Sequence, residues 1–201
     1  MISEIKNQYI SSDKKLWFAL RVSYNRETKL QKHLEELGHE TFIPMIVKET
    51  EQKGILQRKL KPAISNLLFV NILPDEMETI RRDPKIEYPV RYILDHATDG
   101  PTIVPDKQMQ NFMKISKLNK SGCIYLSNDE LKLKKGTRVR VLSGIFKGVE
   151  GEFIRIKRDR KVVVNIPGLM AIATTFVAPD QVEILENQTN NDSKEPINQL
   201  G

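Results

Sequence analysis

Apolar residues in the first 118 positions fall into runs whose spacing alternates between that of strands and that of helices. Four runs rich in strand-forming residues lie at 16–22, 41–47, 67–72 and 90–94. Helical spacing follows the first, third and fourth of these runs, beginning near Asn25, at Pro74 and at Pro105. The apolar positions of these helices are Leu30, Leu34 and Leu37, then Met77 and Ile80, then Met109, Phe112, Met113 and Leu118. The order β-α-β-β-α-β with a trailing helix is the split βαβ, ferredoxin-like pattern.

The segment between the second and third strands breaks this regularity. Pro44 lies inside the second run, so we expect that strand at a sheet edge or at a bulge. Residues 49–61 are polar and highly charged around Gly54. We expect a hairpin tip or an extended loop there.

The pattern changes after residue 118. Residues 119–134 have little periodicity apart from the apolar stretch 123–126, and we interpret them as a linker whose apolar patch either docks back or stays partly ordered. Five short strand-like runs follow at 137–142, 149–156, 161–166, 170–177 and 182–185, with glycine or proline between most of them. Short strands punctuated in this way predict a small β-barrel.

These patterns predict an α+β protein with two domains. We place a flexible N-terminus at 1–15, a ferredoxin-like domain at 16–118, a linker at 119–134, a five-stranded barrel at 135–185 and a disordered tail at 186–201. The composition, 39% hydrophobic and 29% charged over 201 residues, is that of a globular protein. No apolar stretch has the length of a membrane span or of a signal peptide, and the single cysteine, Cys123, cannot form an internal disulfide. We therefore expect a cytoplasmic protein.

Charge adds a hint about partners. The formal net charge is +6, and residues 131–185 hold eleven Lys and Arg against five acids. A basic small domain suits a polyanionic partner, although ordinary solvated lysines have the same composition.

Known catalytic and metal-binding spacings are absent from the sequence. It contains no nucleophile elbow, no His-Glu-x-x-His pair and no phosphate-binding loop. His33 and His39 do not share a helix face, and Gly38 is expected to end the helix before His39. We therefore expect no catalytic residue, no metal and no cofactor, and favour a binding module over an enzyme.

Two stretches carry a family resemblance. Residues 136–141 followed by 143–151 (SGIFKGVEG) are similar to the KOW motif, in which glycines permit a tight turn between two strands of a small SH3-like barrel. The turn residues by this resemblance are Gly144, Phe146, Lys147, Gly148 and Gly151. Residues 17–20 (WFAL), 42–46 (FIPMI) and Pro62 through 67–70 (LLFV) resemble the N-terminal (NGN) domain of NusG. The FIPMI run and the length of the following loop are closest to its specialised paralogues, RfaH and the UpxY antiterminators of capsular polysaccharide loci.

The resemblance implies a non-enzymatic transcription elongation factor. It would bind the clamp helices of bacterial RNA polymerase through an exposed apolar patch and suppress pausing and termination. The family's patch falls on Phe18, Ile64, Leu67 and Phe69. Strand alternation predicts that about half of these four residues lie in the core instead, and Trp17 is expected in the core. Contact with the non-template DNA strand falls on Arg21, Ser23, Tyr24, Arg26, Lys29 and His33, where cations can track phosphates and rings can stack on bases. A ribosomal protein or a termination factor would suit the KOW domain, and the protein is expected to be a monomer.

The chain departs from the family at two places. Ser65-Asn66-Leu67 stands where the family usually has Pro-Gly-Tyr or Pro-Asn-Tyr, and residues 76–78 replace a threonine-rich loop of RfaH. The β-forming residues 162–164 favour a stable barrel over an RfaH-like change into helices. The alternative function is a KOW-type RNA-binding or ribosome-associated protein, and an enzyme with unrecognised carboxylates is a third.

Overall fold

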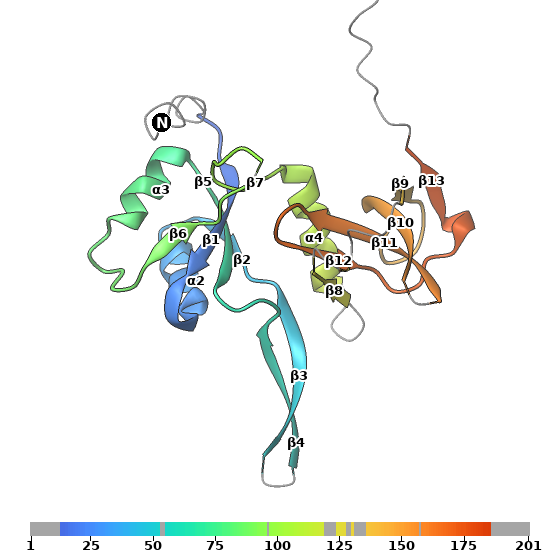
Figure 1. Cartoon of the computed structure of the whole chain (residues 1–201), viewed down its shortest axis with the longest axis horizontal. Helices are drawn as coiled ribbons and strands as arrows, with labels where there is room; N and C mark the ends of the chain where they lie inside the picture. The colour runs from blue at the N-terminus through green and yellow to red at the C-terminus, as the bar shows by residue number, and fades with distance from the viewer. Residues whose placement is uncertain are drawn as a thin grey trace, which may run out of the picture.

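The structure, a computed structural model, consists of two β-sheets on either side of one helix, with a two-stranded ribbon projecting from the body (Figure 1). It describes residues 13–52, 55–95, 97–118, 124–127, 130, 136–156 and 158–185. The predicted disordered tail, most of the predicted flexible N-terminus, most of the predicted linker, Cys123 and His96 lie outside the described residues. Within the described residues, no helix is both long and apolar enough to cross a membrane.

The N-terminal sheet is antiparallel and has the strand order β2-β5-β1-β6, with β7 also pairing with β1. Its strands are β1 (Leu16–Val22), β2 (Glu40–Phe42), β5 (Leu67–Ile72), β6 (Val90–Tyr92) and β7 (Ile103–Val104). The helices are α2 (Glu27–Glu36), α3 (Pro74–Arg81) and α4 (Asp106–Leu118), and a 3₁₀ turn, η1 (Ser23–Asn25), connects β1 with α2. The three predicted helices and the predicted strands at 16–22, 67–72 and 90–94 are thus confirmed in place, the last of them only as far as Tyr92, and β7 was not expected.

The two faces of this sheet pack against different helices because side chains alternate along each strand. Phe18, Leu20, Leu68 and Val70 pack with the apolar residues of α2 and α3. Trp17, Ala19, Leu67 and Phe69 belong to a second core cluster, together with Met109, Phe112, Met113 and Ile115 of α4. Leu37 and Leu118, expected on the apolar helix faces, are instead 52% and 45% exposed, because each lies at a helix end beyond the last packed turn.

Pro44 ends the edge strand instead of lying within it. Strand β2 stops at Phe42, and β3 (Met45–Gln52) begins after Pro44 and pairs only with β4 (Ile55–Pro62) in a separate two-stranded ribbon. A proline has no amide hydrogen for a sheet ladder, which favours a break there. The expected single strand at 41–47 is therefore wrong. Of the two alternatives expected for 49–61, the described residues 49–52 and 55–61 fit the hairpin, because they pair as antiparallel strands.

The C-terminal sheet is antiparallel, with the order β13-β9-β10-β11-β12-β8. Its strands are β8 (Ile124–Leu126), β9 (Thr137–Val141), β10 (Glu150–Ile156), β11 (Asp159–Ile166), β12 (Met170–Ala173) and β13 (Val182–Ile184), and a 3₁₀ turn, η2 (Pro179–Gln181), precedes β13. All five predicted strands are present. The apolar patch of the predicted linker docks back as the sixth strand, β8, along the edge of β12.

Helix α4 joins the two sheets into one core. The core cluster beneath it continues from Phe69 and Phe112 into Val141, Val164 and Ile172 of the C-terminal sheet. The Phe112 ring lies 6.2 Å from those of Phe42 and Phe69 and 6.3 Å from that of Tyr125 on β8. The two sheets are therefore packed against each other through a helix with buried residues on more than one side.

Candidate functional site

Strand alternation separates the four residues of the expected apolar patch. Phe18 is 2% exposed and lies in the core beneath α2 and α3, whereas Leu67 and Phe69, 2% and 0% exposed, lie on the opposite face beneath α4. Ile64, which precedes β5, is 37% exposed. Three of the four patch residues are therefore buried, more than the half that strand alternation predicted, and Ile64 alone of the four is accessible. Trp17, 1% exposed, is in the core as expected, and its indole Nε1 donates to Asp106 Oδ1 at 3.3 Å.

Asn66 connects the Ile64 loop to the turn that carries Tyr24. Its backbone φ is +67°, in the left-handed region that asparagine and glycine adopt more readily than other residues. Its carbonyl accepts from the amide of Val22 at 2.9 Å, and its Oδ1 accepts from the amide of Asn25, also at 2.9 Å. The departure from the family's tripeptide at 65–67 thus keeps a residue suited to this backbone and adds a side-chain hydrogen bond to the turn.

The turn at η1 presents Tyr24 to solvent. Tyr24 and Asn25 have φ values of +62° and +53°, and the Tyr24 side chain is 75% exposed. A tyrosine held in the left-handed region costs free energy of order 1–3 kcal/mol, which residues around a binding site commonly bear. The ring is therefore accessible to solvent and contributes little to the core.

The predicted DNA-binding residues lie on consecutive elements, with Arg21 near the end of β1, Tyr24 in η1, Arg26 at the N-cap of α2, and Lys29 and His33 within α2. Arg21, Arg26 and Lys29 are exposed. The Lys29 ammonium lies 5.8 Å from the ring centre of Tyr88, whose pKa is raised by burial against the lowering effect of Arg26. Tyr88 was not anticipated.

His33 forms a structural contact. Its Nε2 lies 3.0 Å from Asp83 Oδ2, and the two side chains are 22% and 23% exposed. The pKa of Asp83 is lowered, first by the backbone amide of Lys85 and then by the hydrogen bond to His33. This contact ties α2 to the residues after α3, which leaves His33 less free for a nucleic acid than Lys29.

Arg91 is the cation that sequence reasoning missed. It lies on β6 directly opposite Arg21 of β1, and both are exposed. Like charges in directly opposite positions of an antiparallel pair are destabilising, so this pair adds positive potential at some cost to the sheet. Alternation in the stretch 90–92 could have indicated an outward-facing Arg91, but only the register pairs it with Arg21.

Two of the three glycines in the KOW-like turn have the positive φ expected of them, and the third is needed for a different reason. Gly144 and Gly148 have φ values of +76° and +84°, whereas Gly151 is constrained by packing, since a Cβ there would lie 2.4 Å from the carbonyl oxygen of Val163. Phe146 is 4% exposed and fills the core, while Lys147 is exposed. The turn therefore builds the sheet and offers one cation to solvent.

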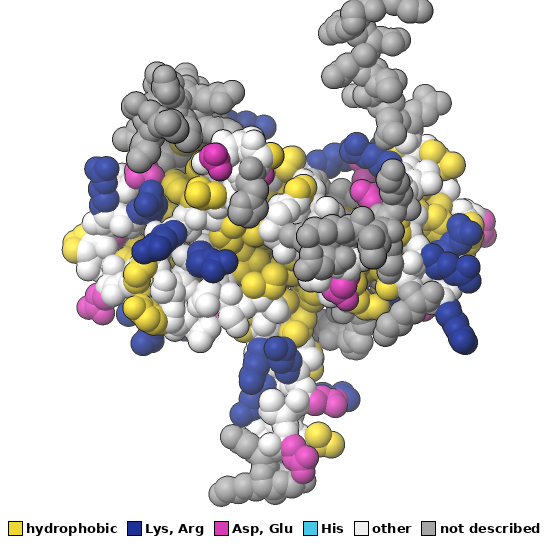
Figure 2. All heavy atoms as spheres, viewed as in Figure 1, with side chains coloured by type: hydrophobic (Ala, Val, Ile, Leu, Met, Phe, Trp, Pro, Cys, Tyr) yellow, Lys and Arg dark blue, Asp and Glu magenta, His cyan; other side chains and the backbone are white. Residues whose placement is uncertain are grey.

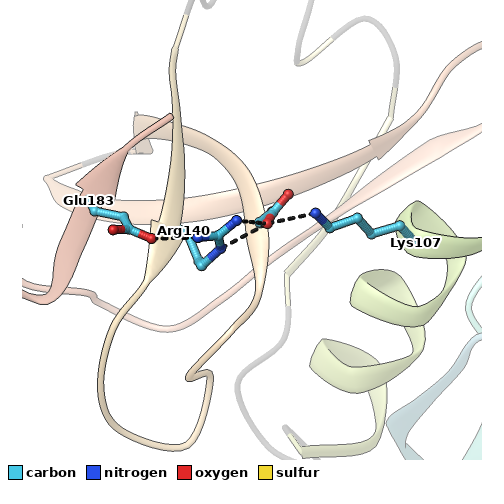
Figure 3. A network of polar contacts seen from close by, with 4 residues as sticks. Lys107, Arg140 and Glu183 are labelled. Carbon is cyan, nitrogen blue, oxygen red and sulfur yellow. Dashed lines mark hydrogen bonds and ion pairs between the residues drawn. The ribbon is translucent and has the colours of Figure 1, made fainter. Parts of the chain in front are cut away.

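An ion network connects α4 to the C-terminal sheet (Figure 3). Glu150 Oε1 on β10 lies 2.8 Å from Lys107 Nζ and 2.7 Å from Arg140 Nη2, and Arg140 Nη1 lies 2.7 Å from Glu183 Oε1. Burial acts to raise the pKa of Glu150, but the hydrogen bonds from Lys107 and Arg140 outweigh it and lower the pKa. The carboxylate is therefore kept ionised between the two cations.

The network borders a cavity between α4 and the C-terminal sheet. The cavity has a volume of about 490 Å³ and is lined by Lys107, Gln108, Arg138, Glu152 and Asn165, among others. The Gln108 side chain donates across its edge to the carbonyl of Asn165. Among the described residues, no group of three or more His, Cys, Asp or Glu side chains is arranged to hold a metal ion.

Comparison with known proteins agrees with the N-terminal half of this description. Residues 15–113 match the family model of NusG, described as transcription termination factor nusG. No curated protein matches the chain. The matched range begins just before β1 and ends within α4, so it contains the N-terminal sheet, the ribbon, Tyr24 and Ile64. Over these residues the chain is similar to NusG, and the match supports a NusG-like transcription factor.

Proposed function

We propose that this protein is an operon-specific antiterminator that binds the clamp helices of bacterial RNA polymerase and suppresses pausing and termination. The observation that carries the proposal is the joining of Ile64 and Tyr24 by Asn66 within a NusG-like unit. The loop before β5 thereby presents an exposed apolar side chain, and the η1 turn to which Asn66 ties it presents an exposed aromatic ring. Such a pair suits a helix surface and an unpaired base, respectively.

The finer assignments follow from the same proposal. The order β2-β5-β1-β6 supports a ferredoxin-like NGN domain over 16–118, and the short antiparallel strands β9 to β13 support an SH3-like KOW barrel over 135–185. The FIPMI run at 42–46 supports a UpxY-like specialisation for polysaccharide loci. The non-template strand would contact Arg21, Tyr24, Arg26, Lys29 and Arg91, and the protein would act in the cytoplasm as a monomer. The partner of the KOW domain would be a ribosomal protein or a termination factor.

The clamp contact is tested with the full chain and purified bacterial core RNA polymerase. We expect co-purification that a clamp-helix peptide competes away, and we expect Ile64→Asp to weaken it by at least tenfold, because an unpaired carboxylate in an apolar interface is costly. Ile184→Asp is the matched control, since Ile184 is 71% exposed and lies on the other sheet.

Two results would contradict the proposal. Full binding by a folded Ile64→Asp variant would remove this loop from the interface. Absence of polymerase binding, together with tight binding to structured RNA, would instead favour a KOW-type RNA-binding protein.

A further inference from the structure

The β3–β4 ribbon leaves the body of the protein with no covering element. Its eight residue pairs run from Met45 opposite Pro62 to Gln52 opposite Ile55, a length of about 25 Å. Within the described part of the chain it pairs with no other strand, and it projects from the body (Figure 1). At its base the Ala63 amide donates to the carbonyl of Pro44, and the Tyr125 hydroxyl donates to the carbonyl of Met45. An isolated two-stranded hairpin is at best marginally stable in water, so a ribbon of this length contributes little to the fold.

The two faces of the ribbon differ in charge. One face carries Met45, Val47, Glu49 and Glu51 opposite Pro62, Leu60, Arg58 and Leu56, and its Arg58 is paired with Glu49 at 2.8 Å. The other face carries Ile46, Lys48 and Thr50 opposite Lys61, Lys59 and Gln57. This second face, defined here as the lysine face, has three cations and no acid. Figure 2 shows Lys and Arg side chains gathered where the ribbon leaves the body.

The charges of the lysine face destabilise the ribbon. Lys48 lies directly opposite Lys59, a like-charge pair that destabilises an antiparallel ladder. All three lysines are exposed, and none takes part in the ion pairs of the described residues. Opposite charges would have been favourable at these positions, as on the other face. The arrangement is accounted for by a polyanionic partner that supplies the missing negative charge.

We propose that the lysine face of the β3–β4 ribbon binds the backbone of double-stranded B-form DNA. A two-stranded ribbon fits the major groove of B-DNA, which is about 12 Å wide, whereas the deep and narrow major groove of A-form RNA excludes it. Lys59 and Lys61 are two residues apart on one strand, about 6.7 Å, so the two side chains leave the same face of the ribbon and each can contact a phosphate of the duplex. The contact is independent of sequence, because lysines on phosphates fix position without reading bases.

The experiment measures binding of the full chain to a 20-bp DNA duplex, without polymerase, over a series of salt concentrations. We expect Lys48→Gln with Lys59→Gln to reduce the slope of log K against log salt by about two and to weaken binding roughly 10- to 100-fold at 0.1 M salt. The double change removes a repulsion, so the ribbon should remain folded. Lys48→Arg with Lys59→Arg keeps both charges and should keep the affinity.

The control is Lys117→Gln with Lys147→Gln, which removes the same charge from exposed positions on α4 and in the KOW-like turn. An unchanged affinity in the ribbon variant would overturn the proposal, and so would an equal loss in the control, which would assign binding to net charge. The proposal would also be overturned if the ribbon variant lost affinity for an RNA duplex of the same sequence but kept its affinity for the DNA duplex. Each result is separable from the clamp contact, because the assay contains no polymerase and leaves Ile64 intact.

Discussion

The β3–β4 ribbon and the C-terminal sheet use the same antiparallel geometry for opposite arrangements of charge. In the sheet, Arg140 lies opposite Glu150 on one neighbouring strand and opposite Glu183 on the other. In the ribbon, Lys48 lies opposite Lys59. The first arrangement satisfies each charge within the protein, whereas the second leaves two cations facing solvent.

The difference separates charges that build the fold from charges that serve a partner. Cross-strand pairs of opposite charge contribute about 0.2–1 kcal/mol, and like charges cost a similar amount. A folded sheet that must pack against α4 gains from the first arrangement. A ribbon that contacts the body only near its base can accept the second, and the N-terminal sheet accepts it too where Arg21 lies opposite Arg91.

The largest loss of stability is expected at Phe112, whose ring joins the C-terminal sheet to the rest of the core. Phe112→Ala removes a ring with 0% exposure that contacts three other rings. We expect a loss of about 3–5 kcal/mol in the free energy of unfolding, measured in urea, because the cavity lies between both sheets. Leu118→Ala, an exposed position on the same helix, should stay within about 0.5 kcal/mol. A loss below 1 kcal/mol at Phe112 would mean that the two sheets are not coupled through α4.

A smaller effect is expected at Glu150, the carboxylate of the ion network. Glu150→Gln should lower stability at neutral pH by about 1 kcal/mol, since Lys107 and Arg140 are partly exposed and solvent screens their attraction. Because the pKa of Glu150 is lowered on folding, its contribution is complete above the ordinary glutamate range and is lost as the pH falls through the lowered value. The difference between wild type and variant should therefore shrink below about pH 4.

The matched control is Glu152→Gln, an exposed carboxylate on the same strand. Unfolding is followed in urea at a series of pH values for all three proteins. A difference for Glu150→Gln that does not vary with pH would show that the network contributes packing and not charge.

The smallest effect is expected at Lys48, where one substitution should change both the stability of the ribbon and its affinity for DNA. Lys48→Glu replaces the repulsive pair by an attractive one and should slow hydrogen exchange of the ribbon amides, by about 0.2–1 kcal/mol in opening free energy. The same change should weaken DNA binding more than Lys48→Gln. Thr50→Glu, which places an acid opposite Gln57, is the control for the added charge. Faster exchange in Lys48→Glu would contradict the account of the ribbon as a compromise between stability and binding.

Much of the fold could be predicted because its signals are local. The helical spacing of Leu30 with Leu34 and of Met109 with Phe112 predicted helices that the structure confirms, and the glycines at 144 and 148 predicted a turn of positive φ. The burial of three of the four predicted patch residues also has a physical reason. Phe18 and Phe69 are both apolar residues in strands, and their own sequence does not say that one faces α2 and the other α4.

The sequence by itself determined the three helices and most of the strands, though not β7 or the division of 41–47 into two strands, because the period of apolar residues and the turn chemistry act over a few positions. Tertiary structure alone decided the partners of those elements. Register placed Lys59 opposite Lys48 and Arg91 opposite Arg21, the fold brought Asn66 to Asn25, and β8 joined the edge of β12. Each of these contacts joins residues that are separated in the sequence, and which ones meet depends on how all the strands and helices share one core.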